Sequence, residues 1–266
     1  MNWLFKRKFK KTIARIELTG AIASAARTRV LEALEFVEKN KFPALLLRID
    51  SPGGTVGDSQ EIYAALKRIR EKTKVVASFG NISASGGVYI GVGADYIVSN
   101  PGTITGSIGV ILRGNNLEKL LDRVGVSFKV IKSGPYKDIL SFDREITEEE
   151  KQILQSLIDS SYNQFVQTVA EGRKLSAATV RSFADGRVFT GEQALELGLV
   201  DRLGTEEDAR IWAAELVGLD PKNTKTFTIK PPKTFANRFL PGSDSLFQSF
   251  QFELETRGVP LWMWQV

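Results

Sequence analysis

The sequence contains neither cysteine nor histidine among its 266 residues. Without cysteine it has no disulfide, no thiolate nucleophile and no cysteine-ligated zinc or iron–sulfur site. Without histidine it lacks the commonest general base and metal ligand, so a Ser-His-Asp triad is excluded. Proton transfer near neutral pH would therefore need a carboxylate with a raised pKa or a lysine amine with a lowered pKa.

Long hydrophobic runs are also missing. No apolar run reaches the roughly 18–20 residues that span a bilayer, and no apolar core of a signal peptide follows the basic start of the chain. From this we expect a protein without a transmembrane helix or secretory signal. Its predicted location is the cytoplasm or the surface of a membrane.

The net charge of +5 is concentrated at the N-terminus. Residues 1–16 contain six basic side chains and no acidic one, which leaves 30 basic and 31 acidic side chains elsewhere. The near-neutral remainder gives no reason to predict nucleic-acid binding. Residues 1–11 have two interpretations: a solvated basic tail, or a peripheral contact with an anionic membrane. The second is favoured by the apolar residues among the lysines, namely Trp3, Leu4, Phe5 and Phe9.

Strand and helix patterns alternate along most of the chain and predict an α/β fold with a mainly parallel sheet. Strands are predicted at 12–18, 43–49, 74–79, 95–98 and 126–132, helices near 25–40, 115–124 and 205–217, a helix through Ile62, Ala65, Leu66 and Ile69, and a strand–helix–strand unit at 187–203. Thr147 and Glu150 form a capping-box pattern that opens a helix reaching about residue 172. Its expected buried face consists of Leu154, Leu157, Ile158, Ser161 and Phe165.

The composition changes after residue 220, where prolines interrupt a stretch without periodicity. We therefore divide the chain into a basic segment 1–11, a main domain 12–220 and an irregular tail 221–266. Aromatic residues in the tail, such as Trp262, indicate that it docks on the body or on a neighbouring subunit. One hypothesis is that 240–266 occupy a neighbour's groove.

Ser85 is the candidate nucleophile. The segment Ser83-Ala84-Ser85-Gly86-Gly87 follows a predicted strand and precedes a predicted helix. Such a turn exposes a hydroxyl at a helix N-terminus, where the free N–H of Gly86 can face an oxyanion. By itself the pattern also fits a serine that only caps the helix.

Two further loops complete the candidate site. In Asp50-Ser51-Pro52-Gly53-Gly54, the backbone of Gly54 could approach a ligand and donate a second N–H, although an ordinary tight turn has the same pattern. In Lys132-Ser133-Gly134-Pro135-Tyr136-Lys137-Asp138, Lys137 is a candidate base. A lysine can act as a base only where desolvation lowers the pKa of its amine, and spacing alone does not distinguish Lys137 from the other lysines.

Together these segments resemble the signal peptide peptidase A (protease IV) family, a relative of the Clp protease subunit and the crotonase fold. The resemblance runs from about residue 12 to 217. It rests on five motifs in order: Asp50–Gly54, Ala84–Gly87, Gly106-Ser107-Ile108-Gly109, Ser133–Asp138, and the run from Gly186 to Asp201.

The resemblance implies a ClpP/crotonase-like fold with repeated strand-helix units around a mainly parallel sheet. It implies a serine endopeptidase with a Ser85–Lys137 dyad, Ser107 orienting the lysine, and Gly54 and Gly86 as oxyanion donors. Substrates would be signal-peptide remnants or membrane-associated polypeptides, cleaved through an acyl-enzyme without metal or cofactor. Single-unit members resemble homo-oligomers in which adjacent subunits share active sites.

Two alternatives remain at this point. A crotonase-type acyl-CoA enzyme would use the same backbone donors for an enolate, and its activity would survive replacement of Ser85. A non-catalytic scaffold at a membrane surface would bind liposomes through residues 1–11 and turn over no peptide.

Overall fold

The computed structural model describes residues 9–230 and 259–264, and within them the chain is organised around an eight-stranded sheet. Six of its strands follow the order β7-β6-β4-β2-β1-β9, with β5 and β8 branching from β4. The pairs are parallel except for β6 with β7. The strands are β1 (Thr12–Thr19), β2 (Ala44–Ser51), β4 (Lys74–Ala84), β5 (Tyr96–Ser99), β6 (Ile104–Gly106), β7 (Val188–Phe189), β8 (Arg202–Leu203) and β9 (Lys225–Thr228).

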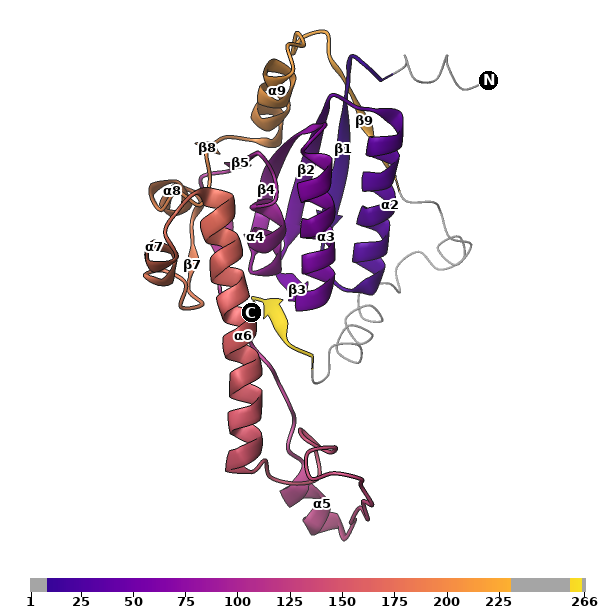
Figure 1. Ribbon diagram of the computed structural model, residues 1–266, viewed down its shortest axis with the longest axis vertical. Coiled ribbons are helices and arrows are strands. Elements are labelled where there is room, and N and C mark those ends of the chain that lie inside the picture. Colours follow the sequence, from indigo (N-terminus) through magenta and orange to yellow (C-terminus); the bar gives the residue numbers. More distant parts are fainter. Residues whose placement is uncertain (1–8, 231–258, 265–266) are drawn as a thin grey trace, which may run out of the picture.

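Helices cover both faces of this sheet (Figure 1). One face is packed by α2 (Ser24–Asn40), α3 (Val56–Ile69) and α4 (Gly86–Gly91), and the other by α9 (Glu206–Leu216). The central strand β2 shows why its sequence is a continuous apolar run. Leu45 and Leu47 belong to the first core, whereas Leu46 belongs to the core under α9.

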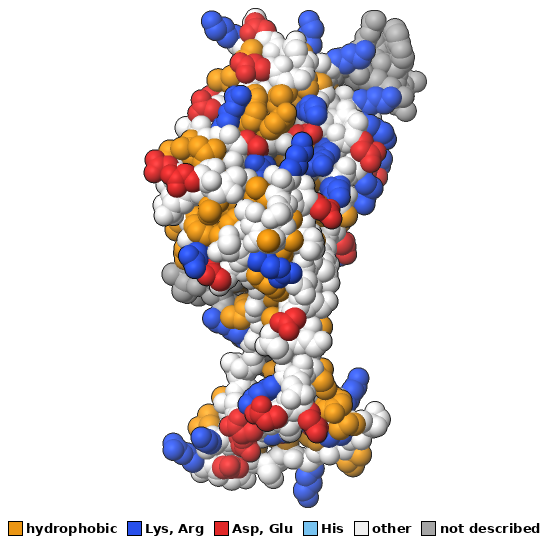
Figure 2. Space-filling model, turned by 60° about the vertical axis from the view of Figure 1, so that its left-hand side comes forward, with side chains coloured by type: hydrophobic (Ala, Val, Ile, Leu, Met, Phe, Trp, Pro, Cys, Tyr) orange, Lys and Arg blue, Asp and Glu red, His pale blue; other side chains and the backbone are white. Residues whose placement is uncertain are grey.

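A segment between β6 and the long helix α6 (Glu148–Arg173) projects from the body. In Figure 1 the N-terminal half of α6 runs away from the sheet to a lobe that contains α5 (Glu118–Val124). Figure 2 shows this lobe joined to the body by a narrow stem. The projecting lobe, residues 112–147, carries Lys137 away from the sheet.

Most predicted elements are confirmed, and the capping box is complete. Thr147 Oγ1 accepts from the N–H of Glu150, whose carboxylate accepts from the N–H of Thr147. The buried face predicted for α6 is wrong in its first half. Ser161 and Phe165 are buried, but Leu157 is 44% exposed because that half of the helix has left the body. The remaining helices are α7 (Ala177–Arg181) and α8 (Gly191–Glu196).

The predicted strand at 126–132 is wrong. These residues form neither helix nor strand, and Ile131 is fully exposed. Val126, Phe128 and Val130 alternate as in a half-buried strand, but no neighbouring strand pairs with them among the described residues. An alternating pattern specifies a strand only when a partner supplies the hydrogen bonds.

Two short strands lie within the region predicted to be an irregular tail. β9 pairs with β1 at an edge of the sheet. β10 (Leu261–Met263) pairs antiparallel with β3 (Gly53–Thr55), the strand formed by the glycine loop. Both pairings join segments far apart in the sequence. Residues 231–258, which include most of the predicted tail, lie outside the described residues.

The predicted membrane contact also falls largely outside them, since Trp3, Leu4 and Phe5 are in residues 1–8. Phe9 is described and does not fit a lipid contact, because it is 8% exposed and packs 4.4 Å from Phe42 between ring centroids. Within residues 9–230 and 259–264, no helix combines the length and apolarity that crossing a bilayer requires.

Candidate active site

Ser85 lies at the sharp turn between β4 and α4. Its backbone has φ 53° and ψ −114°, a strained combination for a residue with a side chain. The N–H of Ser85 donates to the carbonyl of Gly106 at 2.8 Å, which fixes the turn against β6. A strained strand-to-helix turn of this kind is the geometry that presents a nucleophilic serine.

The hydroxyl of Ser85 does not cap the helix. It makes no capping bond to α4, and Oγ is buried without a hydrogen-bond partner among the described residues. A buried, unpaired hydroxyl costs free energy, roughly 1–3 kcal/mol, unless function requires it. The interpretation of Ser85 as a simple helix cap is therefore wrong.

The glycine loop lies beside this turn, and Ile22 hydrogen-bonds to one of its edges. The N–H of Ile22 donates to the carbonyl of Gly53 at 2.8 Å, and the N–H of Thr55 donates to the carbonyl of Ile22 at 2.9 Å. These bonds occupy the inner edge of β3. The N–H of Gly54 therefore faces the opposite edge, along which β10 pairs with β3.

Both glycines of the loop are required by their surroundings. A Cβ on Gly54 would overlap the backbone of Ile22, and Gly53 has a φ of +102°. A side chain at either position would move β3 away from Ser85. The sequence motif thus encodes a close approach of three backbone segments.

Ser107 follows directly on the β4–β6 pairing. Its φ is 50°, it is 8% exposed, and its N–H donates to the carbonyl of Arg187 at 2.7 Å. The carbonyl of Gly106 accepts from the N–H of Ser85, and Gly106 directly precedes Ser107 in the chain. The two serines therefore lie next to each other at the end of the β4–β6 pair. The fold thus brings together Ser85, Ser107, Gly54 and Gly86.

Lys137 is not in this cluster. It is exposed in the projecting lobe, and no contact links it to Ser85. Its neighbour Asp138 accepts from Arg144 at 2.7 Å and from Lys132 at 2.6 Å. The Arg144 hydrogen bond, followed by that from Lys132, holds the pKa of Asp138 well below its usual range.

The same arginine ties the lysine loop to α6. Arg144 donates to both carboxylate oxygens of Glu150, at 2.5 and 2.9 Å, and Glu150 is 2% exposed. The Arg144 hydrogen bond is the main cause that lowers the pKa of Glu150 to about 2. A charged network therefore fixes the loop that presents Lys137.

Tyr89 and Phe165 were not predicted as functional from the sequence, and Trp262 was predicted only as part of a tail that docks on the body or on a neighbour; in the structure it docks on the body. The aromatic side chain of Trp262 is buried against Tyr89 and Phe165, one turn after Ser85 and on α6 respectively. The carbonyl oxygen of Trp262 lies beside Gly53 and Gly86. The aromatic content of the tail was the signal available in the sequence, but nothing local identified its partners.

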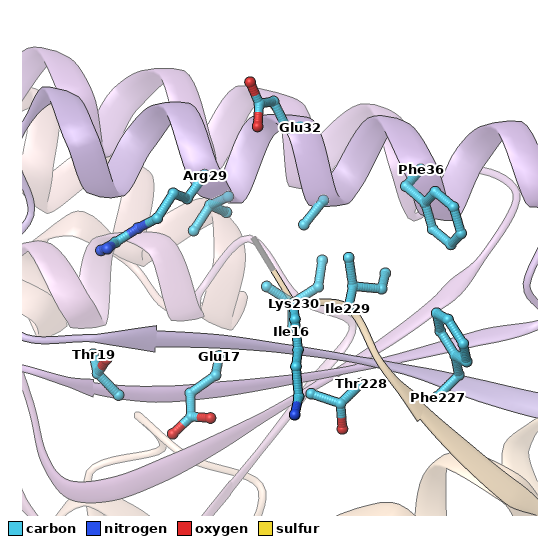
Figure 3. A pocket seen from close by; sticks show the side chains of 12 residues that line it. Ile16, Glu17, Thr19, Arg29, Glu32, Phe36, Phe227, Thr228, Ile229 and Lys230 are labelled. Carbon is cyan, nitrogen blue, oxygen red and sulfur yellow. The ribbon is translucent and has the colours of Figure 1, made fainter. Parts of the chain in front are cut away.

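A large cavity lies elsewhere, between α2 and the edge formed by β9. It has a volume of about 620 Å³, and Figure 3 shows Phe36 and Phe227 facing each other at one end, with Arg29 and Glu32 on the helix above. None of the predicted site residues lines it. Among the described residues, no cluster of three or more carboxylates is arranged to hold a metal ion.

Comparison with protein families identifies the chain. The model of peptidase family S49 matches residues 67–220, more than half of the sequence, and that of Clp protease matches residues 5–99. The chain belongs to peptidase family S49. It is a serine peptidase, as the family resemblance predicted.

Relatives of this S49 peptidase carry matching descriptions. It is 65% identical to a putative protease from Synechocystis sp., over 100% of both chains. It is 36% identical to a putative signal peptide peptidase SppA from Enterococcus faecium, with 75% of this chain and 62% of the relative covered.

Solved structures confirm the predicted ClpP-like fold. The 1510-N membrane-bound stomatin-specific protease, as a mutant in complex with a substrate peptide, matches with a TM-score of 0.57 at 17% identity, covering 92% of this chain and 99% of that one. A mutant of ClpP1 from Listeria monocytogenes matches with a TM-score of 0.52 at 18% identity, covering 73% and 93%.

Proposed function

We propose that this S49 peptidase is an endopeptidase in which Ser85 is the nucleophile and Lys137 of a neighbouring copy is the general base. The observation that carries the proposal is the buried hydroxyl of Ser85, which has no partner within the described chain. In a complete dyad this hydroxyl would donate to a base. Each copy has Ser85 in its body and Lys137 in a projecting lobe, so two copies can supply what one lacks.

The exposed apolar side chains of the lobe support an assembly. Seven apolar residues around α5 and the following loop expose a third or more of their surface: Leu117, Leu120, Val124, Val126, Phe128, Val130 and Ile131. Clustered apolar exposure of this kind is typical of an interaction surface. In the homo-oligomer, this surface would contact a neighbouring copy and bring Lys137 into a site sheltered from water.

The proposed reaction is acyl transfer. The neutral amine of Lys137 takes the proton of the Ser85 hydroxyl, and the serine oxygen attacks a peptide carbonyl. The N–H groups of Gly54 and Gly86 stabilise the oxyanion, each by about 3–4 kcal/mol. Lys137 then gives the proton to the leaving amine, and water hydrolyses the acyl-enzyme by the same route. Ser107 orients the lysine amine.

Substrates of the proposed enzyme are extended polypeptides such as signal-peptide remnants or membrane-associated chains. The descriptions of relatives as signal peptide peptidase support this class. Residues 1–11, which carry five basic side chains, would hold the enzyme at an anionic membrane surface.

Peptide cleavage by wild type, Ser85→Ala and Lys137→Ala tests the dyad. We expect each variant to lose roughly 10⁴-fold or more in kcat. The nucleophile and its base act as one unit, so removing either of them costs about as much as removing both. Mixing the two inactive variants should restore activity at about one site in four, since a copy with Ser85 then meets a copy with Lys137.

Two results would contradict the proposal. Full activity of Ser85→Ala would favour an acyl-CoA enzyme, which does not need the serine. Mixed variants that exchange subunits, as shown by mass spectrometry, yet stay inactive would place both dyad groups within one copy.

A further inference from the structure

The C-terminal strand β10 lies where an extended peptide would bind beside Ser85. On one edge β10 pairs with β3, and on the other Leu261 exchanges two backbone hydrogen bonds with Ile111, at 2.9 and 3.0 Å. Figure 1 shows the strand between β3 and α6, near the C-terminal end of the drawn chain. Strand addition on both edges is a common mode of peptide recognition.

The register of β10 places the carbonyl of Trp262 at the proposed oxyanion donors. The N–H of Val56 donates to Pro260 at 3.4 Å, and the N–H of Trp264 donates to Pro52 at 2.8 Å. In an antiparallel ladder, hydrogen-bonded and non-hydrogen-bonded residue pairs alternate. The pair Trp262–Gly54 lies two residues from each of these bonded pairs and is therefore also a hydrogen-bonded pair.

The second donor segment, which contains Gly86, also lies close to this carbonyl. The oxygen of Trp262 is 3.1 Å from the position that a Cβ on Gly86 would occupy, and a Cβ on Gly53 would overlap it. The carbonyl therefore lies between the glycine loop and the turn that carries Ser85. This is the position that the carbonyl of a cleaved bond must take.

The side chain of Trp262 fills an aromatic pocket. Its ring centroid is 4.1 Å from that of Tyr89 in a stacked arrangement and 4.8 Å from that of Phe165, and it is fully buried. Tyr89 lies one helical turn after Ser85, so the pocket is fixed relative to the nucleophile. The residue whose carbonyl lies between the glycine loop and Gly86 thus places its side chain against two aromatic rings.

We propose that Tyr89 and Phe165 form the specificity pocket of the enzyme, which selects a large aromatic side chain in the substrate residue before the cleaved bond. Trp262 occupies this pocket as a competing ligand built into the chain. The inference rests on the proposed function, since it takes Ser85 as the nucleophile. The indole N–H of Trp262 is buried without an acceptor among the described residues, a cost that a phenylalanine side chain in the same pocket would not have.

The test uses a chain ending at residue 258, which keeps β9 but removes β10, with two hexapeptides: Val-Pro-Leu-Trp-Met-Trp, the sequence of residues 259–264, and the same peptide with alanine in place of the first tryptophan. The truncated enzyme should cleave the tryptophan peptide after its first tryptophan with a kcat/KM about tenfold or more above that of the alanine peptide.

In the full-length chain, Trp262→Ala should raise turnover of the tryptophan peptide. The matched control Trp264→Ala should leave it unchanged, because Trp264 makes no ring contact among the described residues.

Equal kcat/KM for the two peptides would overturn the pocket while leaving the peptidase function intact. Calorimetric binding to the truncated chain with Ser85→Ala separates the two ideas. If that chain binds the tryptophan peptide about tenfold more tightly than the alanine peptide while the truncated enzyme cleaves neither, the pocket is supported and the proposed function fails.

Discussion

The body around Ser85 and the lobe around Lys137 are built in opposite ways. The body buries apolar residues on both faces of the sheet, and Ser85 is 1% exposed within it. The lobe leaves its apolar residues in contact with solvent, with Ile131 fully exposed, and charged contacts of Arg144 connect it to α6. The body buries its apolar residues in its own core, whereas the lobe presents an apolar surface that another molecule can cover.

This difference explains how the two halves of a proposed site can occur in one sequence without meeting in one chain. A nucleophile and its oxyanion donors need positions fixed within fractions of an ångström, which a packed core provides. A base delivered by a neighbour needs a rigid support with an exposed end. The long helix α6 and its charged anchor provide that support.

The largest difference between body and lobe is expected from matched phenylalanine truncations. Phe42 is 1% exposed and packs with Phe9, so Phe42→Ala should lower the free energy of unfolding by about 3–5 kcal/mol. Phe128 is 53% exposed, so Phe128→Ala should cost less than about 1 kcal/mol.

Denaturant unfolding of both variants under conditions that keep the chain monomeric measures the difference. Comparable losses of stability would show that the lobe contributes to the core of a single copy. In that case its exposed side chains would not be available to a neighbour.

The sequence predicts the body far better than the relation between body and lobe. Residues such as Leu45, Leu46 and Leu47 reveal a strand covered on both faces because periodicity is a local signal. The five motifs likewise place Ser85, Gly54 and Gly86 at loops that follow parallel strands, and such loops meet at one edge of a sheet.

What the sequence does not predict depends on partners distant along the chain. The alternation at 126–132 is that of a strand, but no partner strand is present among the described residues. β10 has a length of three residues and no periodic pattern, and its pairing with the glycine loop depends on contacts made by Trp262. In the proposed assembly, the position of Lys137 relative to Ser85 depends on how copies contact each other, which no local pattern contains.

A smaller effect is expected from removing the charged anchor of the lobe. Arg144→Ala leaves the carboxylate of Glu150, 2% exposed, without its cation. We expect limited proteolysis within residues 112–147 to become about tenfold faster, while fragments of the body remain resistant.

Arg187→Ala provides the matched control for this change. Arg187 pairs with Asp185, but both side chains are at least half exposed. Exposed pairs contribute little, so this variant should be cleaved at the rate of the wild type. Equal protection of Arg144→Ala and Arg187→Ala would mean that apolar contacts, such as that between Phe128 and Phe142, hold the lobe instead.

The smallest effect concerns acid pH and acts on the same anchor. The pKa of Glu150 is lowered from its ordinary value of 4.5 to about 2, and the pKa of Asp138 is also lowered, in both cases mainly by hydrogen bonds from Arg144. A carboxylate with a depressed pKa in the folded state contributes stability that is complete above the unfolded pKa and is lost as the pH falls through the folded one. Amide exchange, corrected for intrinsic rates, should therefore lose protection at the start of α6 between about pH 4.5 and pH 2, while β2 stays protected. Arg144→Ala should weaken this pH dependence, leaving only the part due to the hydrogen bond from the N–H of Thr147 to Glu150. A decline that is the same in β2 and α6 would instead indicate global unfolding of body and lobe together.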